Sequence, residues 1–105
     1  MGKTIISDDG RFEWDAKKDR QNIKNHGFSF CEILEVFDDP AFLEGADLEH
    51  SDMEERYYGI GCLNNVVYIV VFYTERGKRK RIISARQADT DDKELYNDYF
   101  KQING

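Results

Sequence analysis

The sequence predicts a single α+β domain over residues 1–105, in which a small antiparallel β-sheet packs with an N-terminal helix hairpin and a C-terminal helix. Its 105 residues suffice for one modest core. Capped helical patterns lie near both ends, and segments rich in β-branched and aromatic residues lie between them. No repeat or linker divides the chain. The expected element order is β-α-α-β-β-β-β-α.

The N-terminal elements follow from their boundary residues. "RFEWD" at 11–15 reads as a short strand, and Asp15 can cap a helix over 16–26. Gly27 would end that helix in a left-handed conformation.

"SFCEILEVFDDP" predicts the second helix of the hairpin. Ser29 and Glu32 have the spacing of a capping box, and Pro40 disfavours helix at Asp39. The "HGF" link is short enough only for a helix hairpin.

The remaining pattern predicts strands and a last helix. "AFLEG" at 41–45 is a possible short strand. Longer strands at 56–63 and 66–74 flank Asn64-Asn65, a two-residue turn, because asparagine tolerates positive φ. "RGKRK" then turns the chain into a strand at 81–88. Asp91 and Glu94 are the expected caps of the C-terminal helix.

Charge is segregated along the chain, whose formal net charge is −6. Residues 31–55 hold ten Asp or Glu and no Lys or Arg, whereas residues 76–86 hold six Lys or Arg and no acid. A basic face can therefore exist on an acidic protein.

Other classes of protein find little support. The longest apolar run, at 66–73, is far below the ~20 residues of a spanning helix, and the N-terminus has no signal-peptide pattern. Cys31 and Cys62 form no CxxC pair, which fits a reducing cytoplasm. No cofactor and no metal site are expected.

Four stretches resemble one known family when taken in order. They are "FEWDAKKDRQNIKNHGFSF", "EVFDDP", "EHSDMEERYYGIG" and "VVFYTERGKRKRIISARQADTDDKELY". Together they resemble the BrnT toxins of bacterial type II toxin–antitoxin modules, from about Phe12 to Tyr96. The resemblance implies a RelE-like fold and an endoribonuclease that cuts RNA and arrests translation. It also implies a ribbon-helix-helix antitoxin of the BrnA kind, with operator DNA bound only through that antitoxin.

The family activity gives the basic stretch a chemical role. Cleavage by the neighbouring 2′-hydroxyl needs preorganised cations around the phosphate, and guanidinium matches two phosphate oxygens. Arg86 matches the arginine of the family's "S.R" motif, and Arg81 and Arg76 are further candidates. Strict alternation would put Arg81 and Arg86 on opposite faces unless a bulge intervenes. A salt bridge to the C-terminal helix is the structural alternative for Arg86.

For several of the other candidates a structural role is the favoured interpretation. His26, Lys24 and Tyr96 are candidates for proton transfer, although a histidine at a helix C-terminus also fits the macrodipole. The predicted RNA-binding residues are Lys78, Arg79, Lys80 and Trp14. For each of the lysines and Arg79 taken singly, a solvated hairpin tip is the favoured interpretation, and a lone Trp is most often core.

Two other functions stay open at this point: a non-catalytic nucleic-acid-binding module, and a small domain whose basic hairpin meets an acidic protein. The acidic 31–55 segment is expected to face the antitoxin, away from the RNA.

Overall fold

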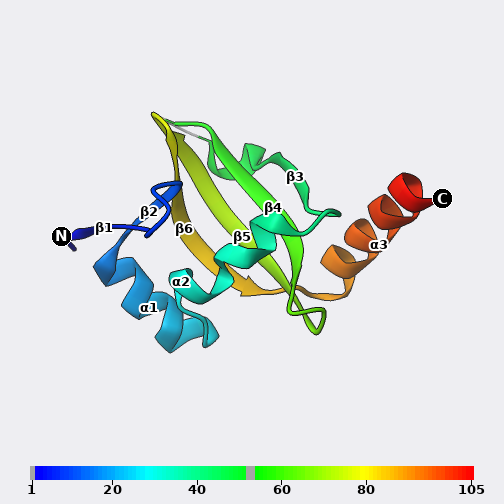
Figure 1. Ribbon diagram of the computed structural model, residues 1–105, viewed down its shortest axis with the longest axis horizontal. Helices are drawn as coiled ribbons and strands as arrows, with labels where there is room; N and C mark the ends of the chain where they lie inside the picture. The colour runs from blue at the N-terminus through cyan, green and yellow to red at the C-terminus, as the bar shows by residue number, and fades with distance from the viewer. Residues whose placement is uncertain (1, 52–53) are drawn as a thin grey trace.

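The computed structural model describes residues 2–51 and 54–105, so residues 52 and 53 of the predicted acidic loop lie outside the described residues. Its sheet has six strands in the order β1-β2-β6-β5-β4-β3 (Figure 1). The strands are β1 Thr4–Ile6, β2 Phe12–Asp15, β3 Leu43–Ala46, β4 Arg56–Leu63, β5 Val67–Arg76 and β6 Arg79–Gln87. The helices are α1 Ala16–His26, α2 Phe30–Ile33 and α3 Thr90–Asn104, with 3₁₀ turns η1 Leu34–Asp38 and η2 Leu48–His50. No described helix is long and apolar enough to cross a membrane.

The expectation of a purely antiparallel sheet is wrong at one pairing. β2 runs parallel to β6, with Glu13 opposite Arg81, while β1 adds an unpredicted antiparallel edge strand. The chain leaves β2 through α1 and α2 before returning as the β3–β6 meander. That helical crossover permits a parallel pairing, which a hairpin turn could not make.

The N-terminal helix hairpin is also only partly correct. α1 has the predicted bounds, with the Asp15 carboxylate accepting a hydrogen bond from the Lys18 N–H at 3.0 Å and with Gly27 at φ 81°. α2, by contrast, is a single turn that tightens into η1. This segment contains several acidic residues and no basic one. Acidic side chains near a helix C-terminus interact unfavourably with the negative end of the helix dipole, which disfavours a longer α-helix here.

The C-terminal half follows the predicted order. β4 has the predicted bounds, and Asn64 and Asn65 adopt the left-handed conformation at φ 55° and 59°. α3 begins earlier than expected, because Asp89 and Asp92 form its capping box in place of Asp91 and Glu94.

Different helices cover the two faces of the sheet. On the covered face, side chains of α2 and η1 share one core cluster with Ile69, Val71 and Tyr73 of β5. α1 lies against β2 and β6 (Figure 1). The opposite side is the open face, whose β5 side chains are Val70, Phe72 and Thr74. There α3 covers one end, where Val70 and Tyr96 belong to a second, smaller cluster.

Asn22 continues the sheet edge where β2 ends. Its side-chain amide donates to the Ala85 carbonyl at 2.9 Å and accepts from the Ala85 N–H at 3.0 Å, as a neighbouring strand would. It also donates to the Phe28 carbonyl at 2.9 Å, and the residue is 4% exposed. The Asn22 side chain therefore joins α1, the following loop and β6.

A β-bulge shifts the alternation of β6. Phe72 pairs with Ser84 and Tyr73 pairs with Ile82, so Ile83 is an additional residue with no partner in this register. Arg81 lies opposite Thr74, and Arg86 lies opposite Val70. Since Thr74 and Val70 share the open face, the bulge places both arginines on that face as well.

Candidate nucleic-acid interface

The basic 76–86 segment divides between the two faces. Arg79 and Arg81 pair in register with Arg76 and Thr74, so they project from the open face together with Arg86. Lys80 projects from the covered face, where its ammonium lies 5.5 Å from the Tyr73 ring centroid and 3.1 Å from Glu75. The open face therefore receives the guanidinium groups, and the covered face receives Lys80.

Arg81 forms an ion pair with Glu13 across the parallel β2–β6 pairing. The distance from its NH1 to Glu13 Oε2 is 2.5 Å. Both side chains reach solvent in part, with 21% of Arg81 and 14% of Glu13 exposed. The pair is therefore held by two strands and lies at the surface of the open face.

Arg86 joins β6 to the start of α3. Its NH1 donates to Asp92 Oδ2 at 2.7 Å and to the Gln87 carbonyl at 3.2 Å, and its guanidinium carbon lies 5.7 Å from the Phe72 ring centroid. Burial tends to raise the pKa of Asp92, but the hydrogen bonds from Arg86 and Asp89 hold the pKa below its usual value. The salt bridge foreseen as the structural alternative for Arg86 is present, and 34% of its side chain is still exposed.

Arg76 and Arg79 lie nearer the hairpin. Arg76 binds Glu54 through two hydrogen bonds of 2.8 and 3.1 Å, which lower the pKa of Glu54. Arg79 Nε donates to the Gly10 carbonyl at 3.2 Å.

Sequence reasoning missed two open-face residues, Arg56 and Tyr58. Arg56 pairs in register with Thr74, and Tyr58 pairs with Phe72, which places both beside the arginines of β6. Alternation along 56–63, combined with a hairpin register set by Asn64-Asn65, could have predicted this placement.

The proton-transfer candidates are not brought together with the arginines. Lys24 and His26 lie on the exposed side of α1, and His26 lines a pocket of about 240 Å³ with Ser84. Tyr96 is buried, and its hydroxyl donates to Asp39 Oδ2 at 2.7 Å. Burial, followed by that hydrogen bond, raises the pKa of Tyr96.

Trp14 lies in the core of the covered face. It is 4% exposed, and its ring meets Phe30 edge-on at 6.3 Å between centroids. A ring so buried favours the core role for Trp14 over stacking on a base.

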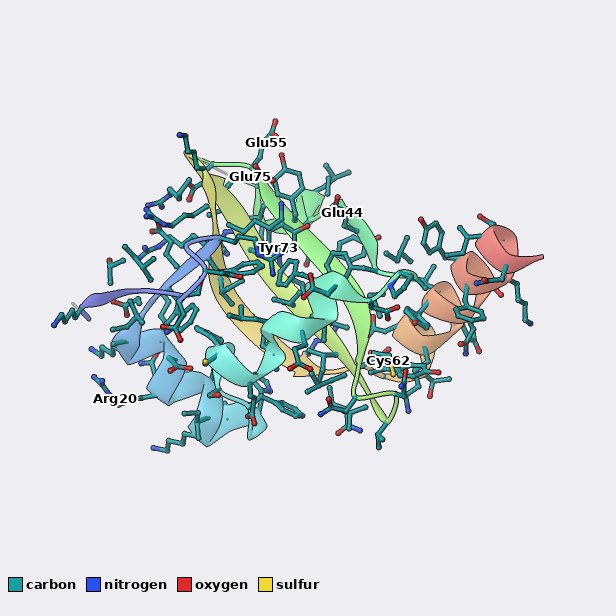
Figure 2. The ribbon with its side chains drawn as sticks, viewed as in Figure 1. Arg20, Glu44, Glu55, Cys62, Tyr73 and Glu75 are labelled. Atoms are coloured by element: carbon teal, nitrogen blue, oxygen red, sulfur yellow. The ribbon has the colours of Figure 1, made fainter. Side chains whose placement is uncertain are left out.

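The covered face ends in a cluster of acids and tyrosines. Figure 2 shows Tyr73 next to Glu44, with Glu55 and Glu75 at the same end of the sheet. The Tyr73 hydroxyl donates to Glu44, and burial, followed by this hydrogen bond, raises the pKa of Tyr73. A neighbouring pocket of about 340 Å³ is lined by Arg11, Phe12, Phe37, Phe42, Glu44, Lys78 and Lys80. Carboxylates thus accompany the lysines there.

The fold and this surface define a small α+β domain with an arginine-rich, partly open sheet face, a class of surface suited to binding phosphate groups. Residues 14–92 match the family model described as ribonuclease toxin, BrnT, of type II toxin–antitoxin system. The chain therefore belongs to the BrnT family of ribonuclease toxins.

A solved structure supports the same assignment. The chain resembles the 1.1 Å crystal structure of the Brucella abortus ribonuclease toxin BrnT with 26% sequence identity and a TM-score of 0.60. The similarity covers 73% of this chain and 94% of the Brucella chain. No curated protein matches this chain.

Proposed function

We propose that this chain is an endoribonuclease that cleaves RNA by metal-independent attack of the 2′-hydroxyl, arrests translation in the cytoplasm, and does so on the open face of the sheet. The observation that carries the proposal is the placement of Arg81 and Arg86 on one partly exposed face, which the bulge at Ile83 produces. Family membership supplies the ribonuclease activity.

The chemistry requires charge stabilisation at phosphorus. As the 2′-oxygen attacks, negative charge grows on the non-bridging oxygens, and a guanidinium can donate two hydrogen bonds to them. One preorganised donor of this kind contributes about 3–4 kcal/mol to stabilising the transition state. Arg81 and Arg86 would supply these donors.

Phe72 and Arg86 offer a platform for the neighbouring nucleotide. The guanidinium lies over the Phe72 ring, and both side chains are partly exposed. Stacking of a base on an aromatic side chain contributes about 1–3 kcal/mol to binding. Arg79, nearer the hairpin on the same face, would contact a further phosphate.

The expected partner is a ribbon-helix-helix antitoxin that binds the acidic 31–55 segment and thereby neutralises the toxin. Ten acidic residues without a basic one make this segment complementary to a basic protein surface. Replacing several of its acids by amides should weaken antitoxin binding and leave RNA cleavage unchanged.

One observation favours a second function, that of a non-catalytic RNA-binding module. Arg76, Arg81 and Arg86 each already hold a carboxylate, so RNA must compete with an acid at each of them. Binding of RNA without cleavage would support this alternative.

Incubation of the purified protein with a defined RNA in EDTA tests the proposal. The expected products are a 2′,3′-cyclic phosphate and a 5′-hydroxyl, and Arg86→Ala should slow cleavage at least about 100-fold. Thermal unfolding of the variant serves as the control for folding. Cleavage that stops in EDTA, or a fully active Arg86→Ala variant, would contradict the proposal.

A further inference from the structure

We propose that Glu13 is the general base that removes the proton from the attacking 2′-hydroxyl. This inference rests on the proposed ribonuclease function, and it assigns a residue that the sequence patterns did not single out. Three carboxylates hold the arginines of the open face, namely Glu13, Glu54 and Asp92. Their hydrogen bonds distinguish them.

Asp92 and Glu54 are occupied by structural bonds. Asp92 Oδ2 accepts hydrogen bonds from both Arg86 and the Asp89 N–H, and the Asp92 N–H completes the α3 capping box. Both oxygens of Glu54 accept from Arg76 near the hairpin tip, where the side chains are 40% and 50% exposed. The Asp92 carboxylate therefore anchors the start of α3, and both oxygens of Glu54 are engaged by Arg76.

Among the described residues, Glu13 differs from Glu54 in having one carboxylate oxygen without a partner, and from Asp92 in taking no part in a helix cap. Arg81 binds its Oε2, and within residues 2–51 and 54–105 no hydrogen bond to its Oε1 is formed. The residue lies on β2 between β1 and β6, so its backbone is fixed on both sides. A general base must lie within hydrogen-bond reach of the proton that it removes, and a rigid strand fixes that reach.

In the proposed reaction, Arg81 stabilises the charge on the phosphate and Glu13 accepts the proton of the 2′-hydroxyl. With Arg81 on a non-bridging phosphate oxygen, the Glu13 carboxylate bonded to Arg81 would lie beside that phosphate, within reach of an adjoining 2′-hydroxyl. The 2′-hydroxyl proton passes to Glu13 Oε1, the 2′-oxygen bonds to phosphorus, and the bond from phosphorus to the 5′-oxygen breaks. The 5′-oxygen takes a proton from water, and Glu13 returns its own proton to solvent.

Glu13→Gln tests this role because glutamine keeps the shape and an oxygen that can accept from Arg81, while it loses the charge and basicity of the carboxylate. Two quantities are measured: single-turnover cleavage of an RNA, and binding of the same RNA with a 2′-deoxy group at the cut site. Cleavage should fall at least about 100-fold, the lower end for a general base. Binding should stay within about threefold, since Arg81 remains held.

Two further variants separate basicity from structure. Asp9→Asn is the matched control, because Asp9 is also an arginine-paired carboxylate, on the turn before β2. It should cleave normally. Glu13→Ala should be inactive and regain cleavage when formate is added, because formate can occupy the vacated space and accept the proton.

The outcomes distinguish this inference from the function beneath it. If Glu13→Gln cleaves at the wild-type rate while Arg81→Ala is inactive, the general base is another group and the ribonuclease proposal stands. If the wild-type protein does not cleave RNA in EDTA, the proposed function itself fails. A Glu13→Gln variant that loses binding and cleavage equally would assign Glu13 to positioning Arg81 alone.

Discussion

The two faces of the sheet receive residues from the same basic segment and use them differently. On the covered face, Lys80 lies between Glu75 and the Tyr73 ring, at the edge of a core sealed by α2 and η1. On the open face, Arg81 and Arg86 lie on either side of the bulge and remain partly exposed. Residues that are adjacent in the sequence thus lie on different faces of the sheet. The open face presents several cations that one RNA strand could contact together.

This difference shows how one residue can organise a surface. In a regular strand without the bulge, the spacing of five residues between Arg81 and Arg86 would direct their side chains to opposite faces. The bulge changes that parity, and the charge density of the open face follows from it.

The largest expected effect comes from comparing alanine substitutions at two adjacent residues on opposite faces, with the rate of RNA cleavage as the measurement. Arg81→Ala should reduce RNA cleavage at least about 100-fold, because it removes a phosphate contact and the partner of Glu13. Lys80→Ala, one residue earlier on the covered face, should stay within about threefold of wild type. Cleavage rates of the two variants at equal RNA concentration give the comparison directly. Equal losses in both would mean that the hairpin acts only through its total charge.

Removal of the link between α1 and β6 should have the next largest effect, this time on stability. Asn22→Ala leaves the Ala85 N–H and two carbonyls without their side-chain partner in a buried site, so the free energy of unfolding should fall by about 2–3 kcal/mol. Urea denaturation measures the loss. Asn25→Ala, exposed on the same helix, is the control and should change little. Comparable loss in both variants would assign the effect to helix propensity.

Much of this fold follows from local chemistry in the sequence. Asp15, Gly27 and the Ser29–Glu32 capping box predicted their helix boundaries, because each satisfies backbone groups within a few residues. The Asn64-Asn65 turn likewise fixed the β4–β5 hairpin. Such features depend on neighbours in the chain, so one sequence suffices to predict them.

The features that escaped prediction depend on distant partners. The parallel pairing of Glu13 with Arg81 joins residues 68 positions apart. The bulge at Ile83 depends on how β6 meets both β5 and α1, and alternation alone gives the wrong parity. Trp14 was expected at the interface because of its neighbours in the motif, whereas its period-two position with Phe12 directs it into the core.

The smallest effect near neutral pH, and a growing one in alkali, should come from the two buried tyrosines, one on each face. Burial raises the pKa of Tyr73 on the covered face and of Tyr96 on the buried side of α3, in each case assisted by a hydrogen bond to a carboxylate. The folded state therefore keeps these protons at a pH where the unfolded chain, with a tyrosine pKa of about 10, releases them. Stability should be constant below about pH 9 and fall as pH rises above about 10.

Urea denaturation between neutral and strongly alkaline pH measures this loss, and Tyr73→Phe and Tyr96→Phe apportion it between the faces. Each variant should lose stability at neutral pH through its missing hydrogen bond and then show a shallower alkaline decline than wild type. A Tyr96→Phe variant that cleaves RNA normally would also remove Tyr96 from the proton-transfer candidates. An alkaline decline unchanged in both variants would place the titrating groups elsewhere and leave the burial of the two hydroxyls without energetic consequence.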